Sequence, residues 1–229
     1  MTVMEGHYSD YVAVRNYFSE PEHLAELDAV CARIRQHGIE DVALGAPLSN
    51  IVINVSVLDA DGDVLILQRS DTVKTYARAW QVGAHETMNW STEYRAGDPE
   101  DVPETCFGMA RRALREEIGL EPDHYNSKIV FSWFGLYVKD ASFYFFAHTK
   151  SRLAKAEIEY RVRRHASHSW ETRAISWIPF RQKALREVVE SWAGVSGIAP
   201  VSQVDRHGRT WLPHSPISVV QLWRARNML

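Results

Sequence analysis

The sequence predicts an α+β fold, and three observations along the chain support this class. Two strand-like segments, 51–58 and 64–69, flank the turn signal Asp59-Ala60-Asp61-Gly62 and predict a β-hairpin. A helix with one apolar face follows this hairpin. Aromatic strands and further helices come after it, an order that differs from the regular strand–helix alternation of a doubly wound sheet.

The composition is that of a globular protein without a strong electrostatic signature. The chain has 229 residues, of which 45% are hydrophobic and 24% charged, and its net charge is −3. The negative charge argues against a nucleic-acid partner. No segment approaches the roughly 18 apolar residues of a membrane span, and the N-terminus lacks a secretory signal pattern. We therefore expect a cytoplasmic protein with no membrane partner.

The two ends of the chain are helical in pattern. Apolar residues recur at helical spacing between Pro21 and Gly38, and helices are also expected at 181–192 and from Pro216 onward. We therefore expect an N-terminal helical extension over 1–46 and a central domain over 47–182. The C-terminal helical extension, 183–229, is expected to pack on the same core, with Trp211, Leu222 and Trp223 covering it.

The central segments are predicted in order from their local patterns. A short strand at 80–85 precedes a polar insertion at 89–102. Beyond the helix, the remaining segments are two aromatic strands at 129–138 and 142–148, a basic loop at 152–168 that contains His168, and a strand at 174–178. We expect most of the strand aromatics to lie in the core.

The central helix ends in two adjacent carboxylates. Pro103 suits its first turn, an apolar face is formed by Phe107, Ala110, Leu114 and Ile118, and Gly119 ends it. Glu116 and Glu117 lie at the negative end of the helix dipole, where uncompensated anions are unfavourable. A divalent cation such as Mg²⁺, which prefers carboxylate oxygen, would explain them, with Arg112 orienting the carboxylates. The alternative is a solvated surface pair neutralised by nearby arginines.

The window 104–120 resembles the Nudix box. Glu104 is followed by seven residues and then Arg112, and the remaining positions match at Leu114, Glu116, Glu117, Gly119 and Leu120. The resemblance spans about residues 50 to 180. It implies an α/β/α sandwich with a mixed sheet, carrying the N-terminal helical extension and the C-terminal helices. It also implies Mg²⁺ or Mn²⁺ at Glu116 and Glu117, and hydrolysis of a phosphoanhydride in a nucleoside diphosphate linked to another moiety or a similar diphosphate.

Two departures from the Nudix pattern affect the expected chemistry. The Arg-Glu pair of the family is Arg112-Ala113 here, so one carboxylate must come from elsewhere or the activity is weak. A long insertion also separates Glu104 from the preceding loop, and Gly83 is the candidate for the opening glycine of the box.

Other side chains are candidates for the missing carboxylate and for substrate contacts. Glu171 precedes the closing strand, where Nudix relatives often carry a catalytic glutamate on a mobile loop, and we expect it to act as the base. Glu86, beside Gly83, is the second choice. Arg69, His85 and Glu86 are candidate substrate-binding residues. An ordinary structural or solvated role is the alternative for each.

Two other functions remain open. A catalytically impaired Nudix-like module could bind nucleotides or regulate a partner. An enzyme like isopentenyl-diphosphate isomerase would also break the Arg-Glu pair, but its catalytic Cys is missing from the segment Gly83-Ala84-His85. The extensions could form a homodimer interface or a substrate lid. The sequence does not identify which small-molecule diphosphate is the substrate.

Overall fold

The structure is a computed structural model that describes only part of the chain. The described residues are 20–23, 25–26, 29, 32–33, 36, 50–74, 76–88, 104–126, 128–137, 142–181, 183–184, 203–204, 209–212 and 215–225. Their contacts divide the chain into two compact units. One comprises 1–52, 87–104 and 134–145, and the other comprises 53–86, 105–133 and 146–229. The insertion 89–102 and most of the 1–46 extension and of the helix expected at 181–192 lie outside the described residues.

The predicted β-hairpin is confirmed. Strand β1 (Asn50–Leu58) pairs with the antiparallel strand β2 (Val64–Arg69), and Leu58 lies opposite Val64. The turn between them is fixed by Asp59, whose carboxylate accepts a hydrogen bond from the Asp63 amide at 2.7 Å. Gly62 supplies the positive φ (+93°) that this reversal needs, so Asp59 and Gly62 together explain the turn signal.

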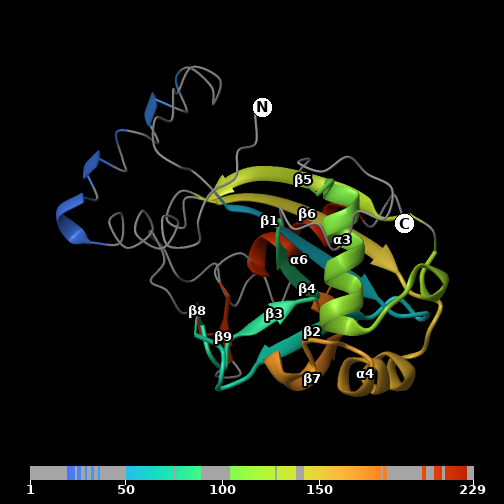
Figure 1. Ribbon diagram of the computed structural model, residues 1–229. Coiled ribbons are helices and arrows are strands. Elements are labelled where there is room, and N and C mark those ends of the chain that lie inside the picture. The colour runs from blue at the N-terminus through green and yellow to red at the C-terminus, as the bar shows by residue number, and fades with distance from the viewer. Residues whose placement is uncertain are drawn as a thin grey trace. The chain divides into compact units, whose positions relative to one another are not determined.

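The hairpin belongs to a mixed sheet. Its main path runs β5-β6-β1-β2-β3-β9-β8, with β4 paired to β1 and β7 paired to β2 (Figure 1). The pair β3–β9 is parallel, whereas β2–β3, β2–β7 and β8–β9 are antiparallel. The bounds of the other strands are β3 (Trp80–Val82), β4 (Ala84–Thr87), β5 (Val130–Tyr137), β6 (Ser142–Lys150), β7 (Thr172–Ile178), β8 (Gln203–Val204) and β9 (Thr210–Trp211).

Helical segments accompany this sheet. Their bounds are η1 (Pro21–His23), α3 (Cys106–Ala113), η3 (Leu114–Ile118), η4 (Pro122–His124), α4 (Lys155–Arg164), η6 (Ser169–Glu171) and α6 (Ser215–Ala225). Helix α3 continues directly into η3, which is a π-helical turn. Beyond η1, the described residues among positions 24–36 are also helical, as the sequence predicts for that segment.

The two faces of the sheet in the larger unit contact different helices. On one face, alternate strand residues such as Leu58 and Ile66 pack in a cluster with Val219 and Leu222 of α6 and with Trp211. On the other face, Gln81 of β3 donates a hydrogen bond to Glu117 of η3. The helix carrying the two adjacent glutamates is therefore opposite α6, as an α/β/α arrangement requires (Figure 1).

Two expectations from the sequence are wrong. The basic segment 152–168, expected as a loop, contains α4, because Ile158 and Val162 at i, i+4 spacing are both buried and anchor an otherwise charged helix. Phe107, expected on the buried face of α3, is 53% exposed, and Met109 is buried instead. Its ring meets Phe131 edge-on, with the ring centroids 4.9 Å apart.

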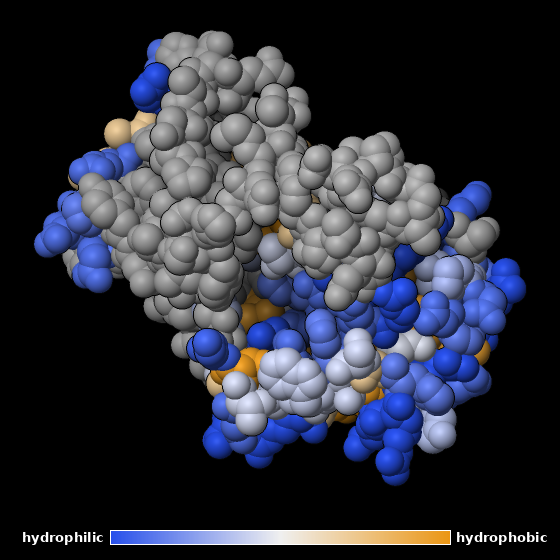
Figure 2. All heavy atoms as spheres, viewed as in Figure 1, coloured by the Kyte–Doolittle hydropathy of each residue, from blue (hydrophilic) through white to orange (hydrophobic). Residues whose placement is uncertain are grey.

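The coloured residues on the face drawn in Figure 2 are mainly hydrophilic, and hydrophobic patches between them are small. The apolar side chains are instead in the interior, since many aliphatic strand residues of the larger unit are fully buried. Within the described part of the chain, no helix has both the length and the apolar character to cross a membrane.

Candidate active site

Local sequence signals determine where the glutamate-bearing helix begins and ends. The Thr105 hydroxyl caps α3 by accepting a hydrogen bond from the Gly108 amide at 3.0 Å. At the other end, Gly119 adopts φ +75° and its amide donates to the Arg115 carbonyl. A Cβ on Gly119 would lie 2.9 Å from the Arg161 carbonyl oxygen, so glycine also permits the close approach of α4.

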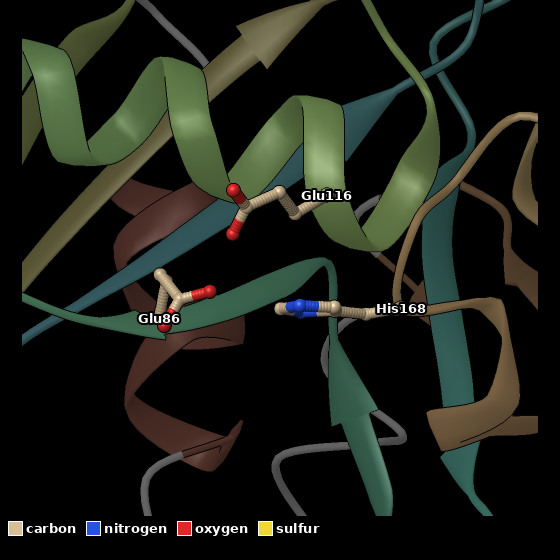
Figure 3. Close-up of side chains that lie close together, drawn as sticks. All are labelled: Glu86, Glu116 and His168. Atoms are coloured by element: carbon tan, nitrogen blue, oxygen red, sulfur yellow. The ribbon is translucent and has the colours of Figure 1, made fainter. Parts of the chain in front are cut away.

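Three potential metal-binding side chains converge beside the last turn of this helix. One ligand atom from each of Glu86, Glu116 and His168 lies within 4.8 Å of the other two. In Figure 3 the carboxylates of Glu86 and Glu116 and the imidazole of His168 point toward one another from a strand, the helix and a loop. All three residues are partly buried.

Main-chain hydrogen bonds hold the segment that carries His168. The amide of His168 donates to the Glu116 carbonyl at 2.8 Å, which ties the segment to the end of the helix. A few residues later, the carbonyl of Glu171 accepts from the Ser70 amide at 2.7 Å. Glu171 therefore ends a 3-10 turn fixed to the end of β2, in the position where the sequence predicted a mobile loop.

Arg112 connects the two carboxylates of the cluster. Its Nη1 atom lies 3.1 Å from Glu86 Oε2 and 3.4 Å from Glu116 Oε2, and the side chain is 5% exposed. A buried guanidinium with two acceptors fixes the orientation of both and offsets part of their charge. The structure therefore places Arg112 between the two carboxylates, and its orienting role in catalysis stays a prediction.

Glu117 is directed away from solvent. Its Oε2 accepts a hydrogen bond from Gln81 Nε2 at 3.0 Å, and its Oε1 accepts one from the His85 amide, also at 3.0 Å. Burial raises the pKa of this carboxyl well above its usual range, and the charges of Glu86 and Glu171 raise it further. The positive charge of Arg69 and the His85 amide act in the opposite direction.

The strand residues next to Glu117 depend on an unusual backbone position. Gly83 has φ +67° and separates β3 from β4, and its amide donates to the Leu65 carbonyl at 3.0 Å. A Cβ at Gly83 would lie 2.0 Å from the Val55 carbonyl oxygen. Only glycine fits this position, which allows the following His85 amide to bond Glu117.

A second ion pair borders the same cluster. Arg69 Nη2 lies 3.6 Å from Glu171 Oε2, and Arg69 Nη1 donates to Gln81 Oε1 at 3.3 Å. Because Gln81 also bonds Glu117, a continuous polar chain runs from Glu171 through Arg69 and Gln81 to the buried glutamate. Arg69, expected to bind substrate, and Glu171, expected to act as base, thus lie in one network. Glu86 contacts Arg112 instead.

The converging donor set suits a divalent cation. Two carboxylates and one imidazole supply oxygen and nitrogen ligands, and carboxylates are the ligands that Mg²⁺ and Mn²⁺ favour. Within the described residues, the three side chains form a group from which one ion could be reached by all. The chemistry of these residues therefore fits the metal that the sequence predicts, with Glu86 and His168 joining Glu116.

Comparison with solved structures finds proteins of similar fold. The chain is similar to DR0079 from Deinococcus radiodurans, with 14% identity, a TM-score of 0.50, and coverage of 77% of this chain and 85% of that one. It is also similar to a MutT protein from Methanosarcina mazei Go1 (13% identity, TM-score 0.43, 79% and 96% covered). A MutT NUDIX hydrolase from Burkholderia pseudomallei gives 11% identity, a TM-score of 0.40, and coverage of 75% and 96%.

The fold is Nudix-like. At 11 to 14% identity, these similarities concern the fold and not the activity. No protein-family model matches the chain, and no curated protein matches it. In this fold, Glu116 and Glu117 lie on η3 and Glu86 lies on β4.

The candidate site brings together most of the residues expected from the sequence. Glu86, Arg112 and Glu116 are in direct contact, and Arg69 pairs with Glu171. Glu117 lies outside the three-residue group, bonded to Gln81 and to the amide of His85. His85 contributes this backbone amide, and its role toward substrate remains a prediction.

Sequence reasoning missed two residues of this site. It treated His168 only as one of several basic residues, although its position three residues before Glu171 was a usable signal. Gln81, which links Arg69 to Glu117, carried no signal because a single Gln in a short strand is unremarkable in sequence. Ala113 stands where the Nudix pattern has a glutamate. Its side chain is fully buried and supplies no carboxylate at that position.

Proposed function

We propose that this chain is a Nudix-type hydrolase that cleaves a phosphoanhydride with Mg²⁺ or Mn²⁺ held by Glu86, Glu116 and His168. The observation that carries the proposal is the convergence of these three side chains at the end of the glutamate-bearing helix. The Nudix-like fold, the partial match to the box and the arginine that orients both carboxylates support it. The proposed substrate is a nucleoside diphosphate linked to another moiety, or a similar diphosphate.

A bound divalent cation would offset the negative charge that develops on the diphosphate oxygens during cleavage. Arg112 holds the carboxylates of Glu86 and Glu116 in place before the cation arrives. The main chain at His168 is fixed by the hydrogen bond from its amide to the Glu116 carbonyl, which holds this residue beside the cluster. This preorganisation is what a precise ligand set requires.

Glu171 remains our candidate for the base. It is partly exposed, with 27% of its side chain accessible, and so can meet a water molecule. Arg69 lies beside it and offers a guanidinium to the phosphate side of the substrate. In this proposal Glu171 takes the proton from the attacking water, and Arg69 keeps the carboxylate in position until that transfer.

The role proposed for Glu117 differs from the expected direct ligand. Its two hydrogen bonds hold Gln81 and the backbone at His85, which directly precedes Glu86. Glu117 would therefore position the strand that presents Glu86. We name it a positioning residue.

The test is a release assay on the full chain with Mg²⁺ or Mn²⁺. The panel comprises nucleotide sugars, dinucleotides, nucleoside triphosphates, coenzyme A and prenyl diphosphates. We expect metal-dependent phosphoanhydride cleavage of at least one class, and a loss of about 100-fold or more in Glu116→Gln. Glu157→Gln is the matched control, since Glu157 is an exposed glutamate on α4 and its replacement should leave turnover unchanged.

Measuring Mn²⁺ binding together with turnover distinguishes an enzyme from a binding module. Binding of Mn²⁺ by the wild type, with turnover, supports the proposal. Binding of Mn²⁺ and of nucleotides without turnover on any class would replace it with the impaired regulatory module. Absence of any Mn²⁺ binding at millimolar concentration would overturn the metal site itself.

A further inference from the structure

A pocket on the outer side of α3 is separate from the acidic cluster. It has a volume of about 460 Å³ and is lined by Phe107, Arg111, Pro122, Tyr125, Lys128, Ile129 and Val130. None of these residues is a member of the cluster or of the Arg69–Glu117 network. The volume lies within the range of roughly 300–1,000 Å³ that is typical of small-ligand sites.

The pocket and the acidic cluster lie on different sides of α3. Phe107 and Arg111 are four residues apart and share one stripe of α3. Arg112, the next residue, belongs to a different stripe and faces Glu86 and Glu116. A ligand that contacts Arg111 therefore lies on another side of the helix from the cation proposed above.

The pocket combines an apolar surface with positive charge. Phe107 is 53% exposed, an uncommon state for a large aromatic side chain on an otherwise amphipathic helix. Its edge already contacts Phe131, and its exposed surface is available to a second ring. Arg111 and Lys128 supply two cations, and neither forms an ion pair with another described residue. Both are exposed and can reach an anionic group.

Tyr125 forms part of the pocket wall and is only 3% exposed. Its hydroxyl is fully buried, so other atoms of this residue face the pocket. A ligand would therefore meet an apolar surface at Tyr125, as it does at Ile129 and Val130.

We propose that this pocket binds a small organic anion of mononucleotide size that carries a planar ring. Phe107 and the aliphatic side chains of Ile129 and Val130 would contact the ring. Arg111 and Lys128 would bind the phosphate or carboxylate of the ligand. The site is independent of the proposed hydrolysis and requires no metal.

Titration of the full chain with phenyl phosphate in the presence of EDTA tests this site, with binding followed by calorimetry and by shifts of the tyrosine ring resonances in NMR spectra. Cyclohexyl phosphate and inorganic phosphate are the comparison probes. We expect phenyl phosphate to bind more tightly than either. Equal affinity for phenyl phosphate and inorganic phosphate would contradict the ring contact, and no binding of any probe at millimolar concentration would overturn the site.

Variants locate the binding. Arg111→Gln and Phe107→Ala should each weaken phenyl phosphate binding by about tenfold or more, since a charged hydrogen bond or a ring contact is lost. The matched controls are Arg164→Gln and Tyr160→Ala, exposed residues of α4 outside the pocket. Unchanged affinity in Arg111→Gln and Phe107→Ala would contradict the proposal.

The acidic cluster serves as a further control. Glu116→Gln should leave phenyl phosphate binding unchanged, because Glu116 does not line the pocket. Loss of binding in that variant would assign the probe to the active site and remove the second site. The outcome for the hydrolysis assay does not affect this measurement.

Discussion

Arg112 lies 3.1 Å from Glu86 and, through the same nitrogen, 3.4 Å from Glu116, so one buried cation joins a helix to a strand. Replacing it with Met leaves both carboxylates partly buried without their shared counterion. We expect Arg112→Met to lower the free energy of unfolding by about 3 kcal/mol in the absence of metal, measured by urea denaturation.

The matched control is Arg173→Met, since Arg173 pairs with Asp71 on the surface at 3.0 Å. Surface pairs contribute little, and the expected change is under about 1 kcal/mol. Equal losses in the two variants would show that Arg112 has no special role in the cluster.

Metal affinities distinguish the two proposed ligand sets. The geometry favours Glu86, Glu116 and His168, whereas the sequence pattern pairs Glu116 with Glu117. We expect Glu116→Gln and His168→Asn each to weaken Mn²⁺ binding by about tenfold or more, and Glu117→Gln to weaken it less. Calorimetric titration measures all three. An equal loss in Glu117→Gln would restore that carboxylate as a ligand.

Replacing Ala113 with the glutamate of the Nudix pattern should make the thermal stability of the chain depend on bound metal. Ala113 is fully buried, three and four residues before Glu116 and Glu117. A third carboxylate there is unfavourable without a counterion, so Ala113→Glu should lower Tm by about 5 °C or more in EDTA. Saturating Mn²⁺ should recover much of this loss. Ala147→Glu, at a buried position in β6, should show a loss without such recovery.

Gly83 should tolerate no side chain. Its φ is +67°, and an added Cβ would lie 2.0 Å from the Val55 carbonyl oxygen, so Gly83→Ala combines backbone strain with a steric clash. We expect a loss of about 3 kcal/mol or more in the free energy of unfolding. Gly62→Ala is the comparison, because Gly62 has φ +93° but open space around its Cα. Its loss should be about 1–2 kcal/mol.

His148 should make stability depend on pH. The ring is buried in β6, both nitrogens lack partners among the described residues, and burial lowers its pKa. Below its unfolded-state pKa the unfolded chain binds a proton that the folded chain does not. Stability should therefore fall as the pH drops below about 6.5, by no more than about 1.4 kcal/mol per pH unit.

Urea denaturation between pH 7.5 and pH 5 measures this slope. His148→Phe should flatten it, because the buried titrating group is gone. His165→Phe removes an exposed histidine and should leave the slope as in the wild type. An unchanged slope in His148→Phe would assign the pH dependence to other groups.

The hairpin and the central helix were predictable because their signals are local. Asp59 and Gly62 dictate the turn, and Gly119 marks the end of the helix. The start was expected at Pro103, whereas α3 begins at Cys106 after the cap Thr105. Helix α4 was not predictable in the same way, because only Ile158 and Val162 face the core and the charged residues dominate the pattern. Strand β9 depends on its parallel pairing with β3, a long-range contact that no local pattern encodes.

The candidate site also combines residues that local spacing predicts with residues that only tertiary contacts bring together. Glu116 and Arg112 belong to one helix, so spacing alone places them together. His168 joins them only because its amide bonds the Glu116 carbonyl across the fold. Gln81 connects Arg69 and Glu117 by side-chain bonds that depend on the strand register. Such contacts arise from tertiary structure and leave no periodic trace in the sequence.

The segment from His168 to Glu171 is attached at both ends through its main chain, to the Glu116 carbonyl and to the Ser70 amide. Its path therefore does not depend on which side chains it carries. An engineer could exchange the donor at position 168 for aspartate or cysteine without redesigning the scaffold. The identity of that donor atom, oxygen, nitrogen or sulfur, would then change which metal ion the protein prefers.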